Sequence, residues 1–371
     1  MSVKTAVITD VRYRAAVAAC RQLAEAGWRV VAVQTREDTH CDPPAFSSVS
    51  VTERVWVEGS CRDAEYPTRL REVLCQYDNP LLFCVGAVTL RAVAAERDAF
   101  AAVCRFLVSE AEVLDALNDK EIVHERAAGL GIPVPREFAS EPDVWPVVVK
   151  PHCGEKAGLK AAERYVIAHG PEELFAAREK LRSVDPSPLV QQYVTGDGIG
   201  VSVLLGPEGE LLSALCHRRI REWPVTGGPS ACCVSFYDGQ KVRMAHELLR
   251  SFGFCGLAMV EFKGECFLEV NPRVWGSFPL TEKTGSAMLR RYAAAACGEK
   301  VEAVLPDFRE GVRMHYLLGD AAASLALLRS GRLREAWSGL ADLIRLRDAL
   351  RCRGDDKPFF VYLLRTIQRR I

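Results

Sequence analysis

The 371-residue sequence lacks several patterns that would identify common classes of protein. It contains no run of about 18 apolar residues, so no transmembrane helix is predicted. Its opening, MSVKTAVITDVRYR, does not have the pattern of a secretory signal peptide, and we therefore expect a cytoplasmic protein. Its formal net charge is zero, which favours neither nucleic acid nor an anionic membrane as a partner. Internal repeats and low-complexity segments are also missing.

Several motifs with known chemistry are absent as well. The 14 cysteines include no C-x-x-C pair, so we expect reduced, buried thiols rather than disulfides or a zinc site. The TDVRYR segment after the first apolar run contains no G-x-G-x-x-G, which argues against NAD binding. GEKAGLK has the wrong spacing for a P-loop, and no G-x-S-x-G occurs. The sequence leaves a cysteine nucleophile open, although no cysteine has an evident histidine partner.

What is present begins with alternating strand and helix patterns. Apolar runs at 3–9, 27–34, 54–57 and 80–86 read as strands, and residues 12–26 and 64–77 between them read as helices. Strands that alternate with helices form parallel sheets with helices on both faces. The first 112 residues therefore predict a doubly wound parallel α/β domain.

The middle of the chain has a different pattern. We predict a helix over 120–128 with a cap near Asn118, a strand that ends at Lys150, a helix over 171–183 and a strand over 188–194. Two hairpins follow, with turns at 207–209 and 263–265, and they are separated by a helix over 242–254. Beyond Asp320 the pattern is almost entirely helical. This order predicts an α+β unit followed by a helical extension.

The returning strand of the second hairpin carries the most informative residues. In FLEVNPR, the residues Glu269, Asn271 and Arg273 alternate and would share one face of the strand. Antiparallel pairing would also bring Glu261 close to Glu269, and two neighbouring carboxylates are costly unless a cation lies between them. Oxygen ligands of this kind suit Mg²⁺, and an arginine suits a phosphate or carboxylate. The alternative is an edge strand whose polar face meets water.

Five segments, in this order, resemble the ATP-grasp superfamily of carboxylate–amine ligases: NDK at 118–120, VVVKP at 147–151, LVQQYVTG at 189–196, MVEFK at 259–263 and LEVNPR at 268–273. The resemblance covers about residues 113–300, and the segment before it is similar to the α/β domain that precedes an ATP-grasp fold. It implies three parts. They are a doubly wound parallel-sheet domain over 1–112, a two-lobed ATP-grasp domain over 113–320 (small lobe about 125–193, large lobe about 194–320), and a helical C-terminal extension over 321–371.

The resemblance also implies roles for individual residues. Lys120 and Lys150 would contact the phosphates of ATP, and Arg273 would stabilise the transferring phosphoryl group. The hinge that holds adenine would be Gln191, Gln192, Tyr193 and Val194, with Asp197 near the ribose. Glu261, Glu269 and Asn271 would bind Mg²⁺, with Mn²⁺ as a substitute. Other interpretations remain open: Lys150 as a strand-end lysine that extends to water, Lys120 as a surface charge, and Asp197 as a turn former.

The loop after the second lysine departs from the family pattern. Many ATP-grasp proteins have a glycine-rich loop there that closes over the phosphates, whereas this loop, residues 151–160, has only Gly154 and Gly158. Lys156 and Lys160 would supply charge instead of backbone amides. Whether the loop closes over ATP is left open by the sequence.

The segment 217–233 is the predicted acceptor region. Arg218, Arg219 and Arg221 could meet an anionic substrate, and Gly227 and Gly228 would allow a close approach. The alternative is a basic strand edge that discourages aggregation.

The function implied by the resemblance is an ATP-dependent, ADP-forming ligase. It would activate a carboxylate as an acyl phosphate for attack by an amine, a thiol or another nucleophile. A small-molecule kinase or a carboxylase on the same fold is the alternative, and a non-catalytic nucleotide-binding module is a third. We expect small-molecule substrates, no nucleic acid partner and no membrane contact. The C-terminal helices would pack on the core, complete the acceptor pocket or form a homodimer contact, and docking of their basic, aromatic end on a membrane surface is the alternative.

Overall fold

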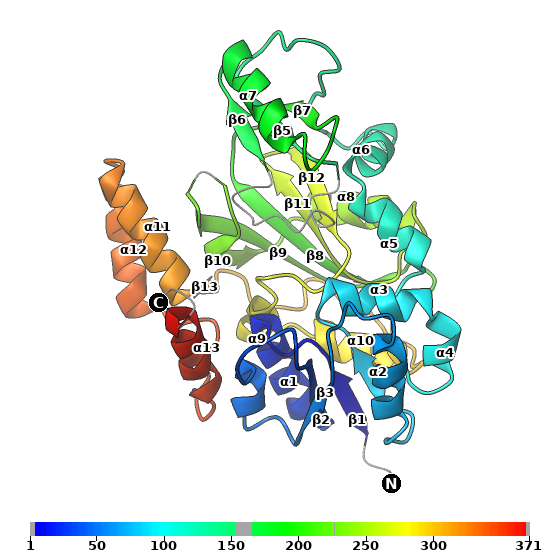
Figure 1. Ribbon diagram of the computed structural model, residues 1–371. Helices are drawn as coiled ribbons and strands as arrows, with labels where there is room; N and C mark the ends of the chain where they lie inside the picture. Colours follow the sequence, from blue (N-terminus) through cyan, green and yellow to red (C-terminus); the bar gives the residue numbers. More distant parts are fainter. Residues whose placement is uncertain (1–3, 153–164, 226, 369–371) are drawn as a thin grey trace.

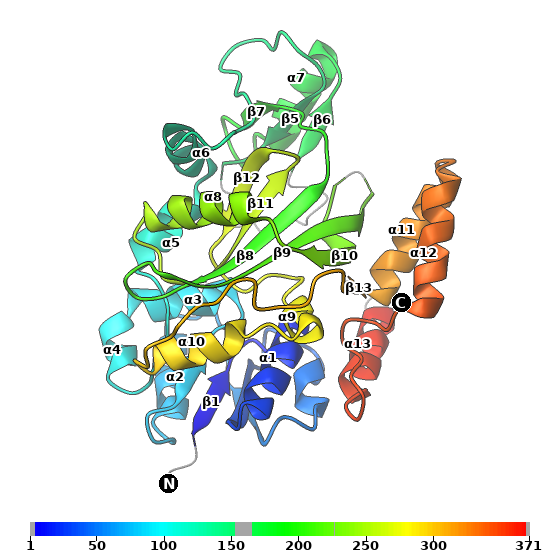
Figure 2. The same cartoon turned by 180° about the vertical axis from the view of Figure 1, so that it is seen from behind.

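The structure is a computed structural model that describes residues 4–152, 165–225 and 227–368. It has four visible parts (Figures 1 and 2). An α/β domain lies at the N-terminal end, a large antiparallel sheet lies next to it, a small lobe extends from that sheet, and the last helices project from one side.

The N-terminal domain is a parallel sheet with the strand order β3-β2-β1-β4. Its strands are β1 (Thr5–Ile8), β2 (Arg29–Thr35), β3 (Glu53–Val57) and β4 (Leu81–Phe83), and its helices are α1 (Arg14–Glu25), α2 (Tyr66–Leu74), α3 (Ala87–Ala95) and α4 (Arg97–Ala101). Ile8 packs in the core that contains α1, whereas its neighbour Val7 packs in the core of α2. Because successive side chains of a strand face opposite sides, helices cover both faces, and the predicted doubly wound sheet is confirmed.

The central sheet has six strands in the order β12-β11-β8-β9-β10-β13. They are β8 (Gly198–Leu205), β9 (Leu211–Glu222), β10 (Ser230–Phe236), β11 (Gly256–Lys263), β12 (Cys266–Asn271) and β13 (Arg313–His315). Both predicted hairpins, β8–β9 and β11–β12, are confirmed. The strands β10 and β13 were not predicted, because β13 has only three residues and β10 begins within the segment that we interpreted as the acceptor region.

Helices cover the two faces of this sheet unequally. The helix α8 (Gly239–Arg250) packs on one face, and α9 (Pro279–Thr284) and α10 (Met288–Ala296) lie between the other face and the N-terminal domain. Along β11, Leu257 and Met259 belong to that second core, and Glu261 lies two residues further along. The side of the sheet that is apolar beneath α10 therefore becomes polar towards the small lobe.

The small lobe is a three-stranded antiparallel sheet in the order β6-β5-β7, covered by one helix. Its elements are β5 (Val147–Lys150), β6 (Val166–Ala168), β7 (Leu189–Gln192) and α7 (Pro171–Leu181), and it is preceded by α5 (Ala111–Asn118) and α6 (Lys120–Gly129). The cap of α6 is Asp119, whose Oδ1 accepts from the amides of Glu121 and Ile122, one residue later than the predicted cap. The predicted lobe boundary near residue 125 divides α6, which packs against β12.

Three helices complete the chain, as the sequence pattern predicted: α11 (Leu317–Arg329), α12 (Leu333–Arg345) and α13 (Lys357–Gln368). The first two form an antiparallel pair that projects beyond the β10–β13 edge of the sheet (Figures 1 and 2). The third packs against η1 (Pro44–Ser47), a short 3-10 helix of the N-terminal domain. Within the described ranges, no helix has the length and apolar character needed to cross a membrane.

Candidate active site

The two acidic residues predicted to converge lie directly opposite each other. Glu261 of β11 and Glu269 of β12 are paired in the ladder of the hairpin. The amide Nδ2 of Asn271 donates to Oε1 of Glu261 at 3.0 Å, and Nη2 of Arg273 donates to Oδ1 of Asn271 at 3.1 Å. The structure therefore gathers the four residues on one face of the hairpin, where strand alternation and a one-residue register shift beside Glu261 set their positions.

The electrostatics of this pair are asymmetric. Burial raises the pKa of Glu261, the guanidinium of Arg219 opposes that rise, and the negative charge of Glu269 adds to it. Burial also acts to raise the pKa of Glu269, but Lys120 and Lys150, followed by Arg219 and Arg273, bring its pKa below the ordinary value. Two opposed carboxylates with the side-chain amide of Asn271 beside them offer hard oxygen ligands, which a divalent cation would stabilise.

These residues suit a Mg²⁺ ion that shares its ligands with a nucleotide better than they suit a metal ion held by protein ligands alone. Among the residues that the structure describes, no group of three or more His, Cys, Asp and Glu side chains is arranged to hold a metal. Mg²⁺ commonly uses one or two protein carboxylates and completes its octahedral shell with water and phosphate oxygens. The donors present therefore suit an ion that arrives with a nucleotide.

Two lysines surround the same carboxylate. Lys120 is the first residue of α6, and its Nζ lies 3.6 Å from Oε2 of Glu269. Lys150 ends β5, where burial and the charge of Lys120 lower its pKa to about 8. The structure thus brings together the two lysines that the sequence placed at the phosphates, and both lie next to a predicted metal ligand.

The predicted hinge follows β7, and most of its backbone is already hydrogen-bonded. The amides of Gln192 and Tyr193 donate to the carbonyl oxygens of Arg136 and Pro146, at 2.8 and 3.2 Å. The amide of Val194 has no partner within the described part of the chain. The side chain of Gln191 is buried and binds inside the protein, so any contact of this residue with a nucleotide would come from its backbone.

A buried histidine that was not predicted connects this hinge to the metal strand. Nε2 of His124 lies 2.8 Å from the carbonyl oxygen of Leu268, to which it donates, and Nδ1 accepts from Nε2 of Gln191 at 2.9 Å. Burial and the nearby charge of Lys150 lower the pKa of His124, so it acts as a neutral imidazole. The sequence feature that could have identified His124 is its spacing: it follows Lys120 by four residues, which places both on the same face of α6.

Arg219 occupies the centre of the site. Its guanidinium hydrogen-bonds Glu261 and also reaches Oε1 of Glu222 and the carbonyl oxygen of Gly228, both at 3.3 Å. Burial opposes its charge, but Glu261 and Glu222 together keep the pKa of Arg219 above the ordinary arginine value. A Cβ at Gly198 on the adjacent strand would lie 2.9 Å from Cδ of Arg219, so glycine provides the space for this side chain.

Two other predicted acceptor residues, Arg218 and Gly227, contact different parts of the protein. Arg218 is exposed and lies 3.3 Å from Oδ2 of Asp197. Gly227 has φ +135°, and its carbonyl oxygen accepts from Oη of Tyr165 at 2.7 Å. A Cβ at Gly227 would lie 2.4 Å from Oη of Tyr165, so this position requires glycine.

Solved structures supply a comparison for this arrangement, whereas no known protein-family model and no curated protein sequence matches the chain. The biotin carboxylase domain of Hydrogenobacter thermophilus 2-oxoglutarate carboxylase, in complex with MgADP, ADP and bicarbonate, superposes with a TM-score of 0.63. It is 14% identical over 84% of this chain and 74% of that chain. An L-amino acid ligase from Bacillus licheniformis gives 0.56 and 16% identity over 82% and 76%. The N5-carboxyaminoimidazole synthetase of Staphylococcus aureus, complexed with ADP, gives 0.57 and 13% over 82% and 80%.

All three are ATP-grasp enzymes. This chain has the ATP-grasp fold. The order of its parts agrees with the sequence resemblance: an α/β domain, a small lobe and a large antiparallel sheet that carries the acidic hairpin.

The prediction for Arg221 requires correction within this ATP-grasp fold. Arg221 is buried, its Nε lies 2.5 Å from Asp320, and its Nη2 lies 2.7 Å from Asp342, so it fixes α11 and α12 to the sheet. The ladder between β9 and β10 shifts register between Arg219 and Arg221. A bulge adds one residue and reverses the faces that follow, so the two arginines do not share a side as strict alternation would require.

A second buried histidine, His217, lies beside the site and was also not predicted. It shares a face of β9 with Arg219, and its Nε2 lies 3.3 Å from Oγ of Ser277. Burial, with a contribution from Arg219, lowers the pKa of His217 to about 3, so the ring is neutral. A Cβ at Gly200 would lie 2.2 Å from the ring, so a glycine again provides the space.

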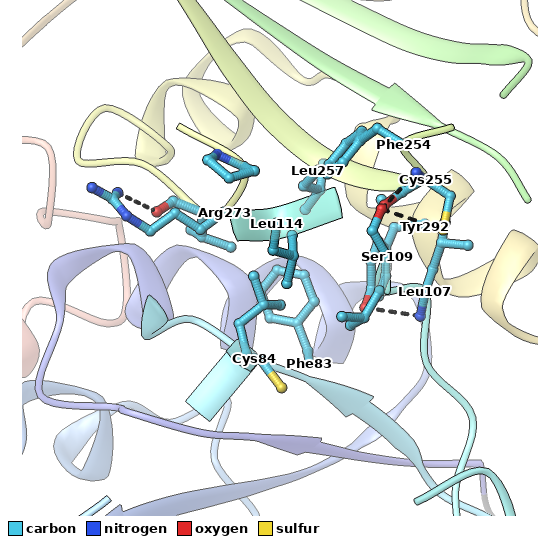
Figure 3. A pocket seen from close by; sticks show the side chains of 15 residues that line it. Phe83, Cys84, Leu107, Ser109, Leu114, Phe254, Cys255, Leu257, Arg273 and Tyr292 are labelled. Carbon is cyan, nitrogen blue, oxygen red and sulfur yellow. Dashed lines mark hydrogen bonds between the residues drawn. The ribbon is translucent and has the colours of Figure 1, made fainter. Parts of the chain in front are cut away.

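A pocket lies beneath the ATP-grasp site at the junction with the N-terminal domain (Figure 3). Its lining is mostly apolar and includes Phe83, Leu114, Leu257 and Tyr292, while the guanidinium of Arg273 points away from it. The pocket is therefore separate from the polar face that carries the carboxylates. The predictions for Gly154, Lys156, Gly158 and Lys160 concern residues outside the described ranges.

Proposed function

We propose that the protein is an ATP-dependent ligase that activates a small-molecule carboxylate as an acyl phosphate, releases ADP, and transfers the acyl group to an amine or another nucleophile. The observation that carries the proposal is the face on which Glu261 and Glu269 lie opposite each other beside Lys120 and Lys150. Phosphoryl transfer depends chiefly on positioning and on neutralising phosphate charge, and this face offers both.

Each residue of the face has a role in this proposal. Glu261, Glu269 and Asn271 would hold Mg²⁺, which neutralises charge on the phosphates when it is bound. Lys120 and Lys150 would bind the phosphate oxygens. The hinge over 191–194 would hold adenine, with the amide of Val194 as the donor that is not used within the described protein, and Asp197 would lie near the ribose.

The chemistry then consists of two displacements. A carboxylate oxygen of the substrate attacks the γ-phosphorus, and the bond from that phosphorus to the β,γ-bridging oxygen breaks and releases ADP. Arg273, which points along the same face, would stabilise the charge on the transferring group. The nucleophile then attacks the acyl carbon, loses a proton, and expels inorganic phosphate.

Arg219 would bind the substrate carboxylate in the acceptor part of the site. Its guanidinium hydrogen-bonds Glu261 and neutralises its charge. A cation at Glu261 would take over that neutralisation, and Arg219 would then be available to bind the substrate carboxylate with its planar fork. Gly228, whose carbonyl oxygen accepts from Arg219, borders the same region and would contact the rest of the substrate together with Gly227. Arg218 alternates with Arg219 along β9 and pairs with Asp197, so any contact it makes with the substrate would come from the other face of the sheet.

A carboxylase is the second candidate, because the similar structure from Hydrogenobacter thermophilus is a biotin carboxylase domain bound to bicarbonate. In that reaction bicarbonate would replace the organic carboxylate as the group that is phosphorylated. A small-molecule kinase would differ by stopping after the first displacement.

Product analysis separates these candidates. The protein would be incubated with Mg-ATP and a panel of carboxylic acids, with and without hydroxylamine, which traps acyl phosphates as hydroxamates. ADP together with a hydroxamate supports the ligase, and bicarbonate-dependent ADP without added acid supports the carboxylase. AMP and pyrophosphate would refute both. Glu269→Gln should abolish ADP formation, whereas Glu208→Gln, at the exposed turn of the other hairpin, should not.

A further inference from the structure

The projecting α11–α12 hairpin exposes apolar side chains that no other described part of the chain covers. On α12, Trp337 is 66% exposed and Ile344 is 87% exposed. Together with Leu333 and Leu340 they follow each other by four, three and four residues, which places them on one stripe of the helix. Leu325 and Leu328 of α11 are also exposed, near the tip of the hairpin.

The hairpin that carries this stripe is firmly built. A Cβ at Gly339 would lie 2.0 Å from Oγ of Ser324, so the two helices approach each other closely at that point. Both helices are also held by the buried Arg221, which contacts Asp320 of α11 and Asp342 of α12. The stripe is therefore an exposed face of a hairpin that is held in place. It is not a core-facing surface that has been exposed by detachment of the hairpin.

Charge distinguishes this region from the rest of the chain. The whole sequence has equal numbers of basic and acidic residues, but residues 321–371 contain eleven Lys and Arg against five Asp and Glu. Three of those acids, Asp342, Asp348 and Asp355, are buried. Exposed arginines border the stripe at both ends of α12: Arg329, Arg332, Arg334, Arg345 and Arg347.

We propose that the α11–α12 hairpin docks the protein on the surface of an anionic lipid bilayer. The stripe of Leu333, Trp337, Leu340 and Ile344 would enter the headgroup region, and the bordering arginines would bind lipid phosphates. Helices that lie in a membrane interface combine apolar and aromatic side chains with flanking Lys and Arg in this way. The proposal takes up the alternative of membrane docking that the sequence left open, and it is compatible with zero net charge because the charge is unevenly distributed.

The charges also decide between a bilayer and a second copy of the chain. Pairing of two stripes would place one row of arginines next to another, with Glu335 as the single exposed acid on α12 to balance them. Like charges close to each other oppose association, whereas an anionic surface complements every arginine of the row. The proposal does not depend on the proposed function, since it concerns a surface away from the acidic hairpin.

Vesicle flotation with the full-length protein tests the proposal. Vesicles of phosphatidylcholine with about 30% phosphatidylglycerol should bind the protein, and phosphatidylcholine alone should bind it at least roughly tenfold more weakly. Trp337→Ser should weaken binding by roughly tenfold or more, because an interfacial aromatic anchor is lost. Arg334→Glu should weaken binding by on the order of tenfold and reduce its salt dependence.

Matched controls keep the result specific to the hairpin. Phe175 on α7 is 67% exposed, so Phe175→Ser removes an equally exposed aromatic elsewhere, and Arg182→Glu reverses an exposed charge near it. Both controls should bind vesicles as the wild type does, and all four variants should keep the wild-type Tm because the altered side chains are exposed.

Several results would overturn the proposal. They are a wild-type protein that does not float with anionic vesicles, equal binding to neutral vesicles, and the same loss of binding in Phe175→Ser as in Trp337→Ser. A dimer in sedimentation that Trp337→Ser dissociates, without vesicle binding, would identify a second copy as the occupant of the stripe.

Discussion

Lys150 should make ATP binding depend on pH in a range where an ordinary lysine does not titrate. Burial and the neighbouring charge of Lys120 lower its pKa to about 8, although Glu269 and Glu137 act in the opposite direction. The protonated side chain is the form that attracts phosphate. It makes up about nine tenths of the population at pH 7 and about one tenth at pH 9, so the Kd for Mg-ATP should weaken roughly tenfold, or about 1.4 kcal/mol.

Isothermal titration calorimetry provides the measurement. Titrations at pH 7, 8 and 9 in two buffers of different ionisation enthalpy give both the Kd and the number of protons taken up. The nucleotide raises the pKa of Lys150 when it binds, so proton uptake should approach one at pH 9 and nearly vanish at pH 7. Lys150→Arg keeps its charge throughout and should bind with little dependence on pH. Lys150→Met should bind weakly at every pH.

Two outcomes would refute this reasoning. If Lys150→Arg weakens between pH 7 and pH 9 as much as the wild type does, another group is responsible for the dependence. If the wild-type Kd is constant to pH 9 while Lys150→Met binds weakly, the lysine binds phosphate but is not held at a lowered pKa. Lys180→Arg, at an exposed position on α7, should leave the pH dependence unchanged.

Three other substitutions test separate parts of the structure. Glu261→Gln should reduce turnover by on the order of a hundredfold and raise the Mg²⁺ concentration needed for half-maximal activity, and an unchanged Mg²⁺ titration would contradict its role as a ligand. Gly196→Ala should destabilise by about 1–3 kcal/mol in urea denaturation, because φ is +115° and the new Cβ would meet backbone at 2.9 Å, whereas Gly129→Ala, with open space around it, should not destabilise. Arg221→Met should cost about 3–5 kcal/mol, because it removes the buried cation between Asp320 and Asp342 and leaves them only His315 and Arg313 as partners. It should also expose α11–α12 to limited proteolysis, and a wild-type digestion pattern would argue against that anchor.

The parts of the site that the sequence predicted are those determined by short-range geometry. Glu261 and Glu269 are separated by one turn, so hairpin pairing brings them close, and a one-residue register shift beside Glu261 places them directly opposite each other. Asn271 and Arg273 follow by alternation. The N-terminal sheet could be predicted equally well, because each of its strands is apolar and is followed by a helix.

The parts that were not predicted depend on irregular pairing or on distant contacts. Arg221 was assigned to the same site as Arg219 because no pattern in the nearby sequence predicts the bulge between them. The two aspartates that bind Arg221 lie 99 and 121 residues away. The strand β10 was not predicted: its pairing with β9 contains two register shifts, and its other partner, β13, is a three-residue strand about 80 positions later.

His124 shows why such contacts matter for the site itself. Its ring joins Leu268, 144 residues away, to Gln191, 67 residues away, and so ties α6 and the hinge to the strand that carries Glu269. A protonated imidazole there would lose its acceptor nitrogen and would add a positive charge next to Lys150. The low pKa of His124, caused by burial and by Lys150, keeps the ring neutral and the network intact. The charge that meets phosphate is therefore left to Lys120 and Lys150, while the histidine fixes the positions of the elements around them.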